Sequence, residues 1–274
     1  VNVRDCGAKG DGVADDTAAL QRAFDIAVKN RGEKPAERAA RSVFIPPGDY
    51  RITASLKLTH EHSGISISGP GGSRGHNNLS PVTRIIWDGP EKGTMVEFHG
   101  VLPVNLTDLH FDGAGKAGIV LRINSSSGSA SAEFHVLRTA LVNADIGIEL
   151  GAEMDMCASD MTFIDLFIDY MKTCAFKAIG GQQVDYVFIR SQFGHTPIGF
   201  HFVNGGVATF NLPLFMWVDT AFRVDQTGIN NGVFTVRGLF FERCAYTDER
   251  RRIQLLDVGG ECNFTVEGIT TSCQ

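Results

Sequence analysis

The sequence lacks the features that would indicate a nucleic-acid, membrane or metal partner. Its 25 Lys and Arg residues stand against 31 Asp and Glu, and no basic stripe alternates with aromatic residues, so we expect no nucleic-acid binding. No apolar run reaches the roughly 18 residues of a transmembrane helix, so we expect no membrane partner. The six Cys residues form no Cys-x-x-Cys pair, and His60 and His62 have no identifiable third ligand, so we expect neither a metal nor another cofactor.

Helical patterns are scarce as well, and one segment near the start carries a clear one. Its apolar residues are spaced as on one face of a helix, which predicts an amphipathic helix over residues 16–29: Leu20, Ala23, Phe24, Ala27 and Val28. An Asp or Thr immediately before this stripe can cap the helix, and Gly10 and Gly12 provide a turn that leads into it. From Val43 onward, short runs rich in β-formers alternate with Gly, Asn and Asp.

These β-rich runs repeat with an almost constant period. Each repeat has two apolar residues spaced by one, a short break, and then two more. The second residue of the first pair falls at positions 106, 136, 163, 189, 212, 236 and 266, at intervals of 30, 27, 26, 23, 24 and 30 residues. A period of roughly 20–30 residues with short strands is typical of a β-solenoid, in which each repeat forms one rung and stacks on the next.

We therefore expect an all-β fold, a single parallel β-helix domain over residues 1–274. Residues 1–42 are expected to form a turn, a helix that caps the first rung and a loop, and residues 43–274 to form the rungs. Because the sequence begins without Met and the last rung has no evident cap, we expect it to be a fragment of a longer chain. A β-sandwich is the alternative, and it would show hairpin turns instead of a constant period.

Two motifs add a family resemblance. Residues 3–21, VRDCGAKGDGVADDTAALQ, resemble the N-terminal signature of the pectate-lyase-like superfamily, in the branch that holds polygalacturonase-related proteins and phage tailspikes. Residues 43–50, VFIPPGDY, match the strand and Pro-Pro-Gly-aromatic segment of that branch. The resemblance implies a right-handed parallel β-helix that handles polysaccharide, is extracellular or on a virion surface, and, through the tailspikes, is a candidate homotrimer.

The resemblance carries over no catalytic residue. The Asn-Thr-Asp, Gly-His-Gly and Arg-Ile-Lys motifs of polygalacturonases are absent, and the Asp-Asp pair at residues 15–16 lies at the start of the predicted helix and not on a rung. Candidates come instead from aligning the rungs. The position after each second apolar pair is expected to face outward, and it reads Asp112, Val142, Asp169, His195, Val218 and Glu242.

Eight residues near this column are candidates for a site. Asp169 and His195 lie on adjacent rungs, about 4.8 Å apart, so we expect them to touch. The candidate catalytic residues are Asp169, His195, Asp219 and Glu242, and the candidate substrate-binding residues are Arg190, Arg223, Arg243 and Tyr170. Carboxylates suit acid–base work on a glycosidic bond, guanidinium groups suit the carboxylate of an acidic sugar, and a tyrosine ring suits a sugar face. Trp217 is assigned to the core by its inward register.

These observations support two functions. The first is a carbohydrate-active β-helix that binds a polysaccharide and cleaves it by hydrolysis or β-elimination. The alternative is a non-catalytic structural or adhesive β-helix, such as a virion fibre or a cell-surface domain. Titratable groups that converge on the outer surface would favour the first.

Overall fold

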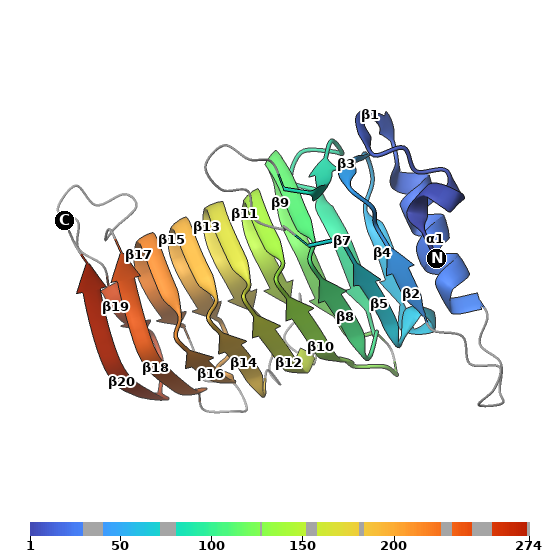
Figure 1. Ribbon diagram of the computed structural model, residues 1–274. Coiled ribbons are helices and arrows are strands. Elements are labelled where there is room, and N and C mark those ends of the chain that lie inside the picture. Colours follow the sequence, from blue (N-terminus) through green and yellow to red (C-terminus); the bar gives the residue numbers. More distant parts are fainter. Residues whose placement is uncertain are drawn as a thin grey trace.

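The chain winds into a parallel β-helix with a helix over its N-terminal end (Figure 1). The structure is a computed structural model that describes residues 1–29, 41–71, 81–126, 128–151, 158–180, 184–225, 232–242 and 254–272. The strands in these segments pair in parallel, rung upon rung, which confirms the solenoid and disagrees with a hairpin-based sandwich.

The strands form three stacks that run along the solenoid axis. The first stack contains β2 (Ser42–Phe44), β5 (Ile65–Ser68), β8 (Val104–Thr107), β10 (Ser131–Leu137), β12 (Ala158–Ile164), β14 (Tyr186–Ile189), β16 (Val207–Asn211) and the first parts of β18 (Gly232–Glu242) and β20 (Cys262–Ser272). The second contains β1 (Asp11–Asp15), β3 (Gly48–Ile52), β6 (Thr83–Trp87), the first parts of β9 (His110–Asn124), β11 (Ala140–Leu150), β13 (Phe167–Ala178), β15 (Gln192–Phe202) and β17 (Leu214–Val224), and the second parts of β18 and β20. The third contains β4 (Leu56–Thr59), β7 (Thr94–His99), the second parts of β9 to β17, and β19 (Gln254–Val258).

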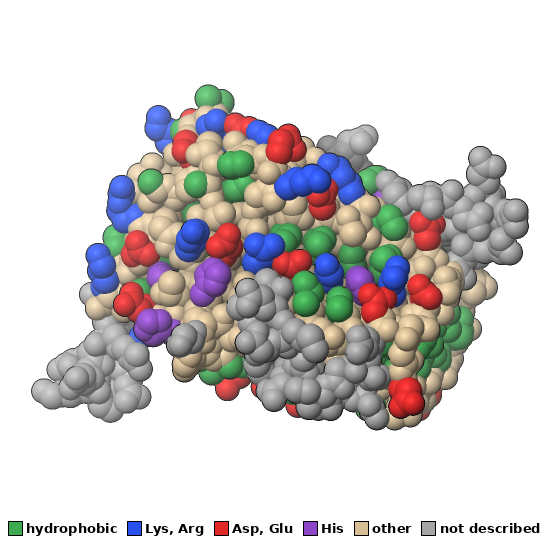
Figure 2. Space-filling model, turned by 180° about the vertical axis from the view of Figure 1, so that it is seen from behind, with side chains coloured by type: hydrophobic (Ala, Val, Ile, Leu, Met, Phe, Trp, Pro, Cys, Tyr) green, Lys and Arg blue, Asp and Glu red, His purple; other side chains and the backbone are tan. Residues whose placement is uncertain are grey.

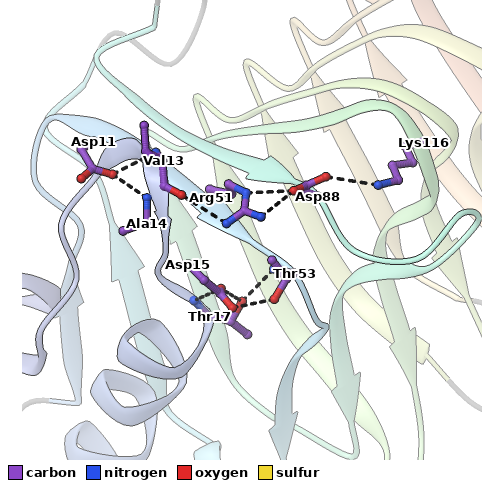
Figure 3. Close-up of polar contacts among 9 residues, drawn as sticks. All are labelled: Asp11, Val13, Ala14, Asp15, Thr17, Arg51, Thr53, Asp88 and Lys116. Atoms are coloured by element: carbon purple, nitrogen blue, oxygen red, sulfur yellow. Dashed lines mark hydrogen bonds and ion pairs between the residues drawn. The ribbon is translucent and has the colours of Figure 1, made fainter.

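The glycine-rich N-terminal motif forms the first strand of the second stack. Residues predicted as a turn include β1, which pairs in parallel with β3. Asp15 accepts a 2.6 Å hydrogen bond from the Thr53 hydroxyl, and Arg51 of β3 donates to the Val13 carbonyl at 3.2 Å and to Asp88 at 2.7 Å (Figure 3). The contacts of Asp15 and Val13 join β1 to the next rung, so Asp15 of the motif has a structural role.

The helix predicted over residues 16–29 is present as α1 (Thr17–Lys29), between two short 3₁₀ helices, η1 (Val3–Cys6) and η3 (His60–His62). It lies across the N-terminal end of the solenoid (Figure 1) and buries the predicted apolar face: Ala19, Leu20, Ala23, Phe24 and Ala27. The Asp16 side chain does not cap this helix. It is 1% exposed and accepts hydrogen bonds from the Lys9 and Gly10 amides at 2.7 and 3.0 Å, which fixes the glycine turn.

Phenylalanine rings fill the middle of the core. Phe163, Phe188 and Phe210 occupy one register position of the first stack and lie nearly parallel, with ring centroids 4.6 and 4.9 Å apart. Phe200 of the third stack packs against this column, 4.9 Å from Phe188 and 4.7 Å from Phe210. Ring pairs at such distances contribute about 0.5–1.5 kcal/mol beyond simple burial, so they favour the observed stacking of rungs.

Three inward positions of the predicted first pairs were wrong. Phe188 and Phe210 are the buried residues, whereas Val187 and Ile189 are only partly buried and Leu212 is 60% exposed. In β14 all four residues are apolar, so the sequence pattern alone does not show which face of this strand is buried. Leu212 lies in the bend between the first and second stacks, where residues on successive rungs have a left-handed backbone: Asp108, Arg138, Asp165, Arg190 and Leu212. A left-handed residue interrupts the two-residue alternation of a strand, so simple counting across the bend goes out of phase.

Opposite charges alternate along the outside of the β-helix. In the third stack, register pairing places one charged row on successive rungs: Lys57, Glu97, Arg122, Glu149 and Lys177. The view from behind shows acidic and basic side chains alternating in a band across the rungs (Figure 2). A second row follows the bend between the first and second stacks, where Arg138 contacts Asp108 at 2.7 Å and Arg190 contacts Asp165 at 2.9 Å. Neighbouring rungs therefore attract each other along both rows.

Candidate functional site

Three aromatic side chains stack at the outer edge where the second stack bends into the third. Tyr170, His195 and Trp217 come from β13, β15 and β17, which are consecutive rungs. The Tyr170 and His195 ring centroids are 4.3 Å apart, and those of His195 and Trp217 are 4.4 Å apart. We call these three residues the aromatic ladder. Both faces of the His195 ring are covered by its neighbours, while Tyr170 is 51% exposed.

The backbone of this bend explains the ladder. Tyr170, His195 and Trp217 have left-handed φ values of 56°, 41° and 50°. This conformation costs a bulky residue on the order of 1–3 kcal/mol, and here it turns the three side chains out of the strand alternation. Trp217 follows the buried Phe215 by two residues, so alternation alone places it in the core. That prediction was wrong, because the bend turns Trp217 to the outer edge.

A largely buried carboxylate holds the central ring of the ladder. His195 donates from Nδ1 to Asp169 Oδ1 at 2.8 Å, so the two residues touch as predicted. The same oxygen accepts a 3.0 Å hydrogen bond from the Tyr170 amide. The Asp169 side chain is 11% exposed and that of His195 is 20% exposed. Gly194 makes the contact possible, because a Cβ at that position would lie 2.7 Å from Asp169 Oδ1.

This geometry defines what the imidazole can do. A neutral imidazole that donates from Nδ1 carries its lone pair on Nε2. A carboxylate behind Nδ1 also stabilises the imidazolium that forms when Nε2 takes up a proton. The Asp169–His195 pair can therefore accept a proton at one defined atom and return it, as a general base and acid does.

The other two candidate carboxylates lie farther along the solenoid. Asp219 follows Trp217 by two residues in β17 and is partly exposed. Glu242 lies opposite Met216 on the next rung, three rung steps from Asp169 and so about 14 Å away. The structure thus brings Asp169 and His195 together and separates Glu242 from them.

The predicted outward column was wrong at two of its positions. Register pairing places Gly194 and Met216 between Asp169 and Glu242, in the positions that the sequence pattern assigns to His195 and Val218. His195 lies one residue farther on, in the ladder, and Val218 is buried.

Counting two residues onward from the buried residue of each second-stack strand identifies the ladder. The residue two positions after the buried residue of each second-stack strand is Tyr170 after Ile168, His195 after Phe193 and Trp217 after Phe215. Counted in this way, Trp217, which the predicted outward column does not include, occupies the same position as Tyr170 and His195.

Two of the predicted substrate-binding arginines contact carboxylates elsewhere on the surface. Arg190 lies in the bend between the first and second stacks, between β14 and β15, and pairs with Asp165. Arg223 lies in the third stack and contacts Asp225 at 2.7 Å. This hydrogen bond raises the pKa of Arg223. Arg243 lies outside the described residues.

Metal and thiol chemistry find little support in the segments that the structure describes. Within them, no group of three His, Cys, Asp or Glu side chains is placed to hold a metal ion. Among the same residues, no helix combines the length and apolar character needed to cross a membrane.

Cys6, Cys174 and Cys262 are free thiols, and the remaining Cys residues lie outside the described residues. Burial raises the pKa of Cys174 to about 12, so this thiol is protonated at neutral pH.

Comparison with known sequences supports the resemblance of the N-terminal segment. Residues 1–81 match the family model described as rhamnogalacturonase A/epimerase, pectate lyase-like. The chain is 44% identical over 54 residues to mannuronan C5-epimerase AlgE6 of Azotobacter vinelandii, a stretch that covers 20% of this chain and 5% of the relative. It is 46% identical over 52 residues to alginate lyase 7 of the same organism, covering 19% and 5%. The match thus spans a small part of the length of these relatives.

Comparison with solved structures covers nearly the whole chain. The phiAB6 tailspike, solved in complex with oligosaccharides of the Acinetobacter baumannii surface polysaccharide, is similar over 99% of this chain and 47% of its own, with a TM-score of 0.69 and 17% identity. The A-module of Azotobacter vinelandii mannuronan C-5 epimerase AlgE6 is similar over 94% and 75%, with a TM-score of 0.53 and 19% identity. At such identities the likeness shows the fold alone, and it confirms the parallel β-helix.

Proposed function

We propose that this chain, as a pectate lyase-like parallel β-helix, binds a polysaccharide across its rungs at the aromatic ladder and cleaves it with the Asp169–His195 pair. The observation that carries the proposal is the 2.8 Å contact of a largely buried carboxylate with an imidazole, beside an exposed tyrosine ring. Aromatic rings with a few well-placed polar groups are a usual lining of sites for small ligands and sugars. A polymer that crosses the rungs meets Tyr170, His195 and Trp217 in turn.

Of the two reactions expected, β-elimination suits His195 better. Hydrolysis by the usual route needs two carboxyl groups that flank the scissile bond, and Asp169 is already engaged by His195 and the Tyr170 amide. β-Elimination needs one base. His195 Nε2 removes the proton next to a sugar carboxyl group, a carbon–carbon double bond forms, and the glycosidic oxygen leaves and takes up a proton. Asp219 and Glu242 are the carboxylates that remain for hydrolysis.

The names of the similar proteins agree with an acidic polysaccharide as substrate. Two relatives are named for mannuronan and alginate, and the tailspike was solved with oligosaccharides of a bacterial surface polysaccharide. We therefore place this chain outside the cell or on a virion surface, where such polymers are met. The non-catalytic fibre is not favoured. The homotrimer expected from the tailspike resemblance is tested by light scattering of the purified protein.

The proposal is tested with a panel of acidic and neutral polysaccharides. Reducing ends report any cleavage, and ultraviolet absorbance of an unsaturated product reports β-elimination. Asp169→Ala and His195→Ala should each lower the rate by about 10²–10⁴-fold. His135→Ala is the matched control, because this exposed histidine lies in β10 of the first stack, on another side of the β-helix.

The outcomes separate the possibilities. Absorbance that rises together with reducing ends supports elimination, and reducing ends without absorbance support hydrolysis. Full activity in both Asp169→Ala and His195→Ala would remove this pair from the mechanism. A protein that binds a polysaccharide and never cleaves it would support the adhesive alternative.

A further inference from the structure

We infer that Tyr170, Trp217 and Gly194 are positioning residues that clamp the His195 ring, so that the imidazole acts through a single edge. The inference rests on the proposed function, because it explains how the Asp169–His195 pair would be kept in a productive geometry. None of the three residues exchanges a proton. Each restricts a different motion of the imidazole.

The hydrogen bond to Asp169 is not sufficient to fix the ring. It holds Nδ1 2.8 Å from the carboxylate oxygen, but the ring can still tilt about its Cβ–Cγ bond over the range in which the hydrogen bond is kept. The neighbouring rings remove this freedom, because Tyr170 lies parallel to the imidazole within 7° and Trp217 within 25°. Stacking on both sides therefore defines the plane of the ring, and the carboxylate defines its orientation within that plane.

Gly194 acts through the carboxylate. It lies opposite Asp169 in the second stack and directly precedes His195. With any side chain at this position, Cβ would lie 2.7 Å from Asp169 Oδ1, the oxygen that accepts from His195. A Cβ here would therefore displace the Asp169 carboxylate from the position in which it accepts from His195, although the φ of Gly194 is not in the left-handed range.

The clamp determines how a sugar approaches the imidazole. The two ring faces are occupied along the solenoid axis, and Nδ1 is engaged by Asp169. The reacting sugar must therefore approach in the plane of the ring, at Nε2. The adjoining sugars then lie over the rungs of Tyr170 and Trp217, so the polymer runs across the rungs and not along one strand.

The clamp itself is tested without substrate. Carbon–proton NMR spectra of the histidine rings are recorded on the full chain, and the His195 signal is identified by its loss in His195→Gln. A ring held between two aromatic faces has its C–H protons shifted upfield by their ring currents. We expect this shift in the wild type and in Trp217→Phe, and a smaller one in Trp217→Ala and in Tyr170→Ala. A His195 signal at the usual histidine position in the wild type would overturn the inference.

The role in catalysis is tested on the polysaccharide that the panel identifies. Trp217→Ala should lower kcat on the order of 100-fold, because alignment of the imidazole is lost, and should also raise KM, because Trp217 is one of the three ladder residues that the polymer meets. Trp217→Phe should restore most of kcat. Gly194→Ala should lower kcat as Asp169→Ala does. Phe44→Ala is the aromatic control, since this residue is 39% exposed in β2 at the N-terminal end of the first stack, and it should leave kcat unchanged.

Two failures are distinguishable. If Trp217→Ala loses the upfield shift but keeps kcat, the ring is stacked but its position does not matter, and the inference is overturned while the proposed function stands. If the wild type shows the shift but cleaves nothing in the panel, the proposed function is overturned, together with the catalytic role of the clamp.

Discussion

Replacing Phe200 by Ala is expected to destabilise the β-helix by about 4 kcal/mol. Phe200 is fully buried, and seven rings of the described core lie with centroids within 6.3 Å of its own: Phe176, Phe188, Phe193, Phe202, Phe210, Phe215 and Phe222. Burial of about 150–200 Å² at about 25 cal/mol per Å² gives about 4–5 kcal/mol, and core Phe→Ala changes usually cost about 3–5 kcal/mol. Phe200→Leu retains most of the volume and should cost about 1.5 kcal/mol.

Urea unfolding followed by circular dichroism measures these differences. The midpoint should fall in the order wild type, Leu, Ala, with an unchanged dependence on urea concentration. Phe44→Ala is the control, since Phe44 is 39% exposed, and it should cost less than about 1 kcal/mol. If Phe200→Ala costs less than about 2 kcal/mol, or if the Leu variant is as unstable as the Ala variant, then close packing of the rings is not what holds adjacent rungs together.

Three further predictions concern charge, thiol reactivity and the bends. Partial burial acts to raise the pKa of Asp225, but hydrogen bonds from Arg223 and His201 outweigh it, so the pKa is lowered. The ionised carboxylate therefore stabilises the fold above about pH 4, and this stabilisation is lost as the pH falls through the lowered pKa. Asp225→Asn should therefore reduce the free energy of unfolding at pH 7, by less than about 1 kcal/mol because the side chain is 36% exposed, and the difference should vanish near pH 2. The Cys174 thiol, with a pKa of about 12, should resist a disulfide reagent at about pH 8 until urea unfolds the protein, and fast labelling of the native state would show that β13 opens. Gly238 lies one rung after Leu212 in the bend between the first and second stacks and has a φ of 64°. Gly238→Ala should therefore lower the free energy of unfolding by about 1–2 kcal/mol, and an unchanged melting temperature would contradict this cost.

The repeats and the capping helix follow from the sequence because they depend on patterns that many residues share. The stripe that includes Leu20 and Phe24 needs a 3.6-residue period, and the rungs need an interval of about 25 residues. Single errors do not destroy such patterns. Placing the inward residues at 189 and 212 instead of 188 and 210 changes three intervals by only one or two residues, so the period of the solenoid is preserved.

The site was predictable only in part, because it depends on local backbone conformation. The placement of Asp169 and His195 on adjacent rungs follows from the rung spacing, although Gly194 is the residue that lies directly opposite Asp169. The outward position of Trp217 depends on the sign of one φ angle, which hydrophobic alternation does not reveal. Arginines are harder still to place, because their long side chains reach whichever carboxylate lies nearest, as Arg190 does with Asp165.

Because opposite charges alternate from rung to rung in two rows, removal of a single rung would bring like charges together. If the rung of β10 and β11 were deleted, Asp108 would face Asp165, and Arg122 would face Lys177 in the third stack. Two carboxylates in one row and two cations in the other would then repel each other between the same pair of rungs. Deleting the next rung as well, that of β12 and β13, would bring Arg190 opposite Asp108 in the bend row but Arg122 opposite His201 in the third stack. Loss of the β10–β11 rung alone is therefore expected to weaken the stacking of the two rungs that it brings together.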